Sequence, residues 1–151
     1  MKHNLILRLI AKYLFPIIAL FAFYVQFHGD YSPGGGFQAG VILSVGFIFY
    51  AMVFGLKTTQ QVIPLNLLRV LASSGVLIYG GTGVATMLMG GNFLDYDLLS
   101  QSPISGQHLG ILLVEAGVGI TVSSVMLTIF YAFAGRDMPC ETSSEDEGDR
   151  Q

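Results

Sequence analysis

Residues 108–134 read HLGILLVEAGVGITVSSVMLTIFYAFA, a run of 27 residues in which Glu115 is the one charged side chain. Crossing the hydrocarbon core of a bilayer takes roughly 20 apolar residues of helix, so this run is long enough to span a membrane. Three more apolar runs of similar length precede it, at about 8–27, 36–56 and 67–90. The sequence therefore predicts an all-α integral membrane protein with four transmembrane helices.

The composition also indicates a membrane protein. The chain is 52% hydrophobic and 11% charged, with a mean hydropathy of +0.63, values that lie outside the usual soluble range. Its net charge is −3 and much of the acid lies in 145–149, so there is no basic patch for nucleic acid. Cys140 is the single cysteine, which excludes an internal disulfide and a thiolate metal cluster.

The basic residues predict the orientation. In a four-span topology all of them fall on one side of the membrane: Lys2, Arg8, Lys12, Lys57, Arg69, Arg136 and Arg150. The two remaining loops carry acids only, Asp30 in one and Asp95 and Asp97 in the other. Because cytoplasmic loops are enriched in Lys and Arg, both termini are expected in the cytoplasm. This organisation gives a membrane domain at 1–135 and a disordered, acidic cytoplasmic tail at 136–151.

Glycine is abundant within the predicted spans. Gly36 and Gly40 lie four apart at the start of the second span, and four glycines crowd the third: Gly75, Gly80, Gly81 and Gly83. In lipid, small residues let helix backbones approach closely, so such helices usually have helical neighbours. We expect some of these faces to dock onto other membrane subunits. The alternative, that they only pack this bundle internally, remains open.

The connection between the first two spans is the most unusual string, HGDYSPGGGFQAG at 28–40. Pro33 fixes one φ angle, and the three glycines at 34–36 permit left-handed backbone angles and close approach by another chain. The glycine spacing formally matches a dinucleotide fingerprint, but that motif requires a preceding strand, and here membrane helices flank it. A tight turn that begins the second span explains the glycines, although not the neighbouring His28 and Asp30.

Glu115 is the second candidate functional feature of the sequence, after the 28–40 segment. An acid near the middle of a span costs about 2.5–3.5 kcal/mol on insertion scales and usually faces a bundle interior or a hydrated cavity. His108 lies seven residues earlier on nearly the same helix face, and Gly119 and Ser123 continue that face. Two interpretations remain open for Glu115, a place on a proton or cation path and a hydrogen-bonded anchor for a neighbouring helix. His108 by itself fits an interfacial residue at the start of the helix.

Signatures of a self-sufficient catalyst or carrier are missing from the sequence. It has no paired nucleophile and base, no metal-ligand cluster and no evident inverted repeat. We therefore expect no enzyme activity and no metal site. The chain fits one piece of a larger ion-translocating complex.

Two motifs resemble a known family. GDYSPGGGF at 29–37 followed by Gly40 is similar to the Gly-His-x-x-Pro-Gly-Gly-Gly-Phe-x-x-Gly signature of the B-type subunits of the Mrp multisubunit cation/proton antiporters, also called Mnh. LVE-x-GVG at 113–119 resembles the last helix of that family. The resemblance covers nearly all of 1–135. One departure is that Asp30 stands where the family has histidine, whereas His28 lies two residues earlier.

The resemblance implies a small subunit of a complex in the bacterial cytoplasmic membrane that exchanges cytoplasmic Na⁺ for external protons and supports pH homeostasis. It implies packing against the large A-type subunit and the C-type subunit, with Na⁺ and H⁺ as transported ions and no cofactor. It also implies a share in the ion path, for which the candidates are Glu115, Asp30, His28 and His108. The residues expected to shape the loop against a partner are Pro33, Gly34, Gly35, Gly36, Phe37 and Gly40.

Two other functions remain open at the level of sequence. Homologous subunits occur in membrane-bound hydrogenases and ferredoxin-dependent respiratory complexes, where the same module couples electron transfer to ion pumping. A scaffold subunit in which Glu115 is purely structural is the other alternative.

Overall fold

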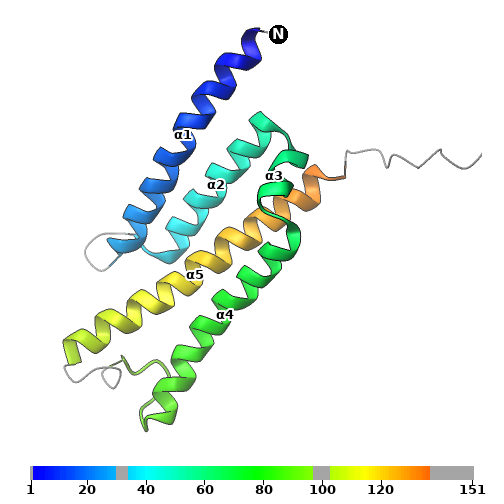
Figure 1. The fold of residues 1–151 in the computed structure, drawn as a ribbon. Coiled ribbons are helices and arrows are strands. Elements are labelled where there is room, and N and C mark those ends of the chain that lie inside the picture. Colours follow the sequence, from blue (N-terminus) through cyan, green and yellow to red (C-terminus); the bar gives the residue numbers. More distant parts are fainter. Residues whose placement is uncertain (1, 30–33, 97–102, 137–151) are drawn as a thin grey trace, which may run out of the picture.

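The computed structural model describes residues 2–29, 34–96 and 103–136, and these ranges contain helices and no strand. The predicted all-α fold class is confirmed. The α-helices, shown in Figure 1, are α1 (Lys2–Phe27), α2 (Gly36–Phe54), α3 (Leu56–Val62), α4 (Leu65–Leu88) and α5 (Pro103–Ala134).

Four helices in the described part of the chain are long and apolar enough to cross a membrane. These spans are Ile6–Phe27, Gly36–Phe54, Leu65–Leu88 and Gly106–Ala134. No boundary differs from the sequence prediction by more than two residues. The predicted tail lies, apart from Arg136, outside the described residues, as do Asp30 and Pro33.

Helix α3 was not predicted, because the sequence analysis expected only a loop between the second and third spans. It holds seven residues, too few for a periodic apolar pattern, and lies between Gly55 and Pro64. Gly55 separates it from α2 with φ 96°, a left-handed backbone angle that ends α2. Thr59 is 1% exposed and its hydroxyl donates to the Gly55 carbonyl at 3.1 Å, which fixes this corner.

Helix α5 is the centre of the arrangement. It packs against α4 on one side and α2 on the other, while α1 packs chiefly against α2 (Figure 1). Leu68 of α4 and Leu127 and Tyr131 of α5 form the core cluster. The Tyr131 hydroxyl donates to the Ile63 carbonyl at 3.3 Å, which ties α5 to the end of α3.

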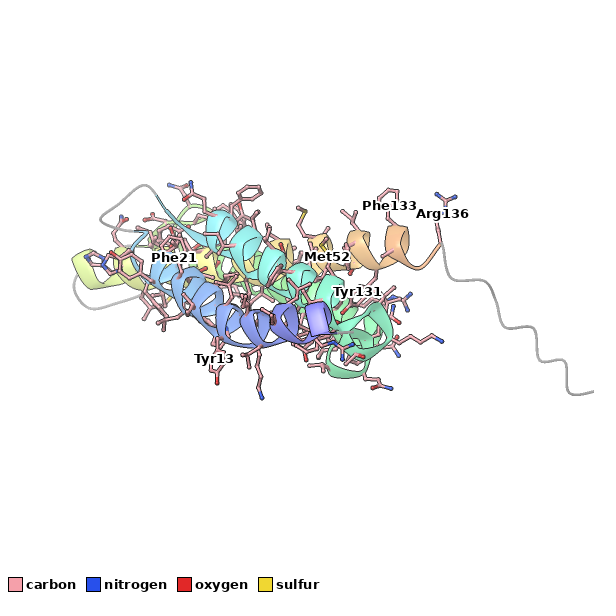
Figure 2. All side chains as sticks on the ribbon, turned by 90° about the horizontal axis from the view of Figure 1, so that it is seen from above. Tyr13, Phe21, Met52, Tyr131, Phe133 and Arg136 are labelled. Carbon is pink, nitrogen blue, oxygen red and sulfur yellow. The ribbon has the colours of Figure 1, made fainter. Side chains whose placement is uncertain are left out.

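Large apolar side chains lie on the outside. Phe21, Met52 and Phe133, labelled in Figure 2, are 54%, 74% and 67% exposed. Buried positions hold small residues instead, such as Ser44, whose hydroxyl donates to the Val41 carbonyl at 2.7 Å. This distribution is the inverse of a soluble core and suits a chain whose outer surface meets lipid or other membrane helices.

Backbone contact between glycines joins α4 to α5. A Cβ atom added to Gly75 would lie 2.6 Å from the Gly117 carbonyl oxygen, and one added to Gly117 would lie 2.9 Å from the Gly75 carbonyl oxygen. Gly80 and Gly81 have nothing within 4 Å of the same position. The glycines of the third span therefore divide: Gly75 packs against α5 and Gly83 against the Phe93 ring, whereas the Gly80 and Gly81 backbone is open.

We predict that Gly75→Ala destabilises the chain and that Gly81→Ala does not. The added methyl at residue 75 meets the Gly117 carbonyl oxygen and the Thr121 hydroxyl, and overpacking of this kind costs about 1–3 kcal/mol. At residue 81 the methyl meets nothing, and the higher helix propensity of alanine favours α4 by up to about 1 kcal/mol. Thermal unfolding of the purified chain in mild detergent, followed by circular dichroism, measures both. Equal melting temperatures for the two variants would contradict this account of the α4–α5 contact.

Candidate functional site

The Glu115 carboxylate lies against the segment that connects α1 to α2. A Cβ atom added to Gly29 would lie 2.5 Å from Glu115 Oε2 and 2.6 Å from Oε1. One added to Gly35 would lie 3.0 Å from Oε1. The carboxylate is half-buried on α5, and only glycine leaves room for it at both neighbouring positions. The structure thus brings together the two features that the sequence analysis singled out separately.

The first turns of α2 touch the backbone of α5 at the same place. A Cβ atom on Gly36 would collide with the main-chain oxygen of Glu115, and one on Gly40 would lie 2.6 Å from the Gly119 carbonyl oxygen. A Cβ atom on Gly119 would in turn lie 3.1 Å from the Gly36 carbonyl oxygen. Gly36 and Gly40 therefore pack inside this chain and not against another subunit. Because they have no side chain, α2 can approach α5 closely beside the carboxylate.

The electrostatic environment suits a negative charge. Gly35 is the N-cap of α2, with φ 129°, and it has no side chain with which to cap the helix. A helix N-terminus carries the equivalent of roughly +0.5 charge, which favours an anion beside it. The Glu115 carboxylate approaches this end of α2, so the fold places the acid of α5 where the dipole of another helix stabilises it.

The two candidate histidines, His28 and His108, lie at the ends of helices. The His28 ring stacks on the Tyr24 ring, with centroids 4.1 Å apart and planes at 29°, and both residues are exposed at the end of α1. His108 is exposed on α5, two turns or about 10 Å along the axis from Glu115. No group of three or more His, Cys, Asp or Glu among the described residues is placed to hold a metal ion.

The other loop residues differ in exposure. Gly34 is half-buried and Gly35 is buried, whereas Phe37 in the first turn of α2 is 64% exposed. Asp30 and Pro33 lie outside the described residues, so their predicted roles stay predictions. Phe37 is the large apolar side chain that this segment presents outward.

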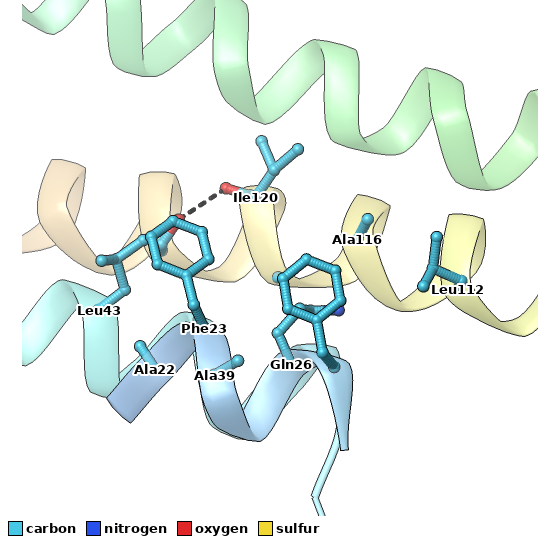
Figure 3. A pocket seen from close by; sticks show the side chains of 12 residues that line it. Ala22, Phe23, Gln26, Ala39, Leu43, Leu112, Ala116 and Ile120 are labelled. Atoms are coloured by element: carbon cyan, nitrogen blue, oxygen red, sulfur yellow. Dashed lines mark hydrogen bonds between the residues drawn. The ribbon is translucent and has the colours of Figure 1, made fainter. Parts of the chain in front are cut away.

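Gln26 is a polar residue of the site that the sequence analysis missed. Its Oε1 lies 2.8 Å from the position of a Cβ atom on Gly119, so the amide reaches from α1 to α5. It borders a cavity of about 210 Å³ between α1, α2 and α5, shown in Figure 3, whose lining includes Phe23, Leu43 and Ser123. The signal in the sequence was a lone amide three residues before Gly29 in an apolar span.

Comparison with known proteins gives consistent matches over most of the chain. A family model described as a domain related to the MnhB subunit of Na⁺/H⁺ antiporters matches residues 6–128. The chain is 34% identical over 139 residues to the protein named "Putative antiporter subunit mnhB2" of Staphylococcus aureus strain Newman. The match covers 89% of this chain and 98% of the relative, and proteins of that name in strains JH1 and COL match equally.

We predict that Gly35→Ala destabilises the chain more than Gly55→Ala. Both glycines have positive φ, 129° and 96°, so alanine strains the backbone at either position by about 1–3 kcal/mol. Only at Gly35 does the methyl also press on Glu115, because nothing lies within 4 Å of the corresponding position at Gly55. The difference between the two melting temperatures in detergent therefore reports the contact with the carboxylate. A Gly55→Ala variant that melts at or below the temperature of Gly35→Ala would contradict that contact.

Proposed function

This chain belongs to the family of domains related to the MnhB subunit of Na⁺/H⁺ antiporters, and we propose that it serves as a small membrane subunit of a multisubunit Na⁺/H⁺ antiporter. It is one component of a transport complex and not an enzyme. The position of Glu115 is the observation that supports a direct role of this chain in ion exchange. This acid of the fourth span lies under the glycine segment and at the N-terminus of α2.

The chain is a multi-pass membrane protein, because it combines antiporter-subunit relatives with four helices that are long and apolar enough to span a bilayer. Within that topology we assign it to the bacterial cytoplasmic membrane, with both termini in the cytoplasm. The positions of Lys and Arg support this orientation. In this orientation the glycine segment and Glu115 belong to the outer half of the membrane.

A carboxylate is chemically suited to exchange. It can take up a proton to become neutral, or it can bind Na⁺ through its oxygens while it is ionised. Because Glu115 supplies a single negative charge, either ion neutralises it and the two compete for it. Na⁺ and H⁺ are the transported ions in this proposal, which requires no cofactor.

As one small subunit of the complex, the chain needs neighbouring subunits for ion exchange. We propose the large A-type subunit and the C-type subunit as the neighbours, with Phe37 and the Gly80–Gly81 backbone as contacts. Phe37 is 64% exposed beside the site, and the α4 backbone at Gly80 and Gly81 has open space around it. Small residues on a membrane-facing surface permit close docking of another helix.

We predict that Glu115→Gln strongly slows exchange while leaving the complex assembled. The amide keeps the size and the hydrogen-bonding capacity of the side chain but can neither ionise nor take up a proton. The measurement is the Na⁺-dependent change in ΔpH in everted vesicles from an antiporter-deficient host that expresses all subunits. We expect the rate to fall by about tenfold or more, and native gels to show the intact complex.

Asp95→Asn is the matched control, because it removes the same charge from the α4–α5 connection outside the spans. We expect it to exchange ions normally. Normal exchange by an assembled Glu115→Gln complex would overturn the ion-path role and leave the chain with a structural role.

We also predict that Phe37 contacts a neighbouring subunit. Replacing it with photoreactive benzoylphenylalanine in the whole complex should give an adduct with the A-type or the C-type subunit, identified by mass spectrometry. The same replacement at Tyr131, which is 4% exposed inside the bundle, should give none. An assembled complex that yields no adduct from residue 37 would exclude this contact.

A further inference from the structure

Two basic side chains lie one turn apart on the outer surface of α1. Arg8 and Lys12 are both exposed, and both fall inside the candidate span Ile6–Phe27. Residues four apart share a helix face, with Cβ atoms about 5–6 Å apart, so the two positive charges are neighbours. Side chains on a helix lean toward its N-terminus, so Lys12 extends toward the turn that holds Arg8. The two cationic groups therefore converge on one part of the surface.

The packing of α1 on α2 gives the depth of this basic pair in the membrane. The Phe15 ring lies 4.9 Å from the Phe47 ring and 5.8 Å from the Tyr50 ring, measured between centroids. Lys12 is about 4.5 Å nearer the N-terminus than Phe15, which puts it level with the last turn of α2. Because α2 has 19 residues, about 28 Å, it matches the thickness of the hydrocarbon core. Lys12 therefore lies at the edge of the core and Arg8 about 6 Å beyond it, at the depth of phospholipid headgroups.

No acidic side chain in the described ranges is near enough to neutralise the basic pair. The acids of these ranges are Asp95 and Glu115. Glu115 lies against Gly29 beyond the other end of α1, about 25 Å from Lys12 along the helix axis. Asp95 follows the end of α4, which runs about 36 Å away from the corner at α3. The counter-charge for Arg8 and Lys12 must therefore come from outside the part of the chain that the structure describes.

Apolar side chains cover the exposed side of α1 between the basic pair and the middle of the membrane. Tyr13, labelled in Figure 2, is 67% exposed, and Ile17 and Leu20 are 62% and 72% exposed. Their spacing of four and three residues places them on one helix face. An apolar surface of this kind suits acyl chains, and the basic pair at its edge suits a headgroup. The two features together fit a phospholipid.

We propose that Arg8 and Lys12 bind the phosphate of an anionic phospholipid whose acyl chains lie along the exposed apolar side of α1. A guanidinium can bind two phosphate oxygens through parallel N–H donors, and a lysine ammonium adds a compact charge. An anion between the two groups also removes the repulsion of like charges one turn apart. Phosphatidylcholine offers the same phosphate, but its choline brings a further positive charge. The site therefore selects phosphatidylglycerol over phosphatidylcholine.

The position of α1 explains what the lipid contributes. This helix packs chiefly against α2 and makes few contacts with α5, so protein holds it mainly on one side. A lipid bound at its basic end stabilises α1 from the opposite side. The proposal concerns lipid binding and is independent of any role of Glu115 in exchange.

The experiment uses the whole complex in phosphatidylcholine vesicles that contain a trace of phosphatidylglycerol with a photoreactive diazirine close to its headgroup. Illumination attaches the probe to nearby residues, and mass spectrometry locates the adducts on α1. We expect about tenfold more adduct than with a phosphatidylcholine probe that carries the same diazirine. Combining Arg8→Gln with Lys12→Gln should lower the yield from the phosphatidylglycerol probe to that of the phosphatidylcholine probe.

Lys57→Gln combined with Arg69→Gln is the matched control. It removes two exposed positive charges from the same end of the bundle, on α3 and α4. The adduct yield on α1 should stay within about twofold of wild type, because attraction to a surface charge falls off within a Debye length. An equal loss in both double variants would overturn the proposal, since general surface charge would then explain the binding.

Competition in the wild-type complex tests the site without any substitution. Excess unlabelled phosphatidylglycerol should lower the adduct yield on α1, whereas excess phosphatidylcholine should not. Equal yields from the two probes, or no lipid adduct on α1, would contradict the proposal. So would a yield that appears only after the acidic residues at 141–149 are removed, because the tail and not a lipid would then neutralise Arg8 and Lys12.

Discussion

The accommodation of one carboxylate inside an apolar bundle is the constraint on which the rest of the structure depends. A charge at this depth requires a polar surrounding, and here the surrounding is backbone: Gly29 and Gly35 lie against the Glu115 oxygens, and the N-terminus of α2 approaches them. Any side chain at these glycines would displace the carboxylate. The carboxylate therefore requires glycine both after the end of α1 and before the start of α2.

Close backbone contact holds α5 on both sides of this carboxylate. Gly40 meets Gly119 on the side of α2, and Gly75 meets Gly117 on the side of α4. Large side chains could not fix α5 in this way, because they lie mostly on the outside of the bundle. The position of the carboxylate is consequently set by main-chain atoms, which have far fewer alternative arrangements than side chains. A site built in this way is sensitive to a single added methyl group.

The sequence was sufficient for the spans and for Glu115 and the glycine segment as separate features, because hydropathy and the cost of a buried charge act locally. The contact between Glu115 and the glycine segment was not predictable from the sequence. A charge inside the membrane needs a polar neighbour, but the sequence does not say which helix or loop provides that neighbour. Helix α3 was missed because seven residues between Gly55 and Pro64 carry no periodic signal. Gln26 was missed because a single amide near the end of a span resembles an interfacial residue, and only the register of α1 on α5 reveals its place.

The arrangement also suggests why exchange would be coupled. In the proposed function the N-terminus of α2 is a fixed positive end, so the local charge changes only when the Glu115 carboxylate gains or loses an ion. Binding Na⁺ and H⁺ together would leave an excess positive charge in apolar surroundings, which is strongly unfavourable. One carboxylate beside one helix terminus thus makes occupancy by the two ions mutually exclusive.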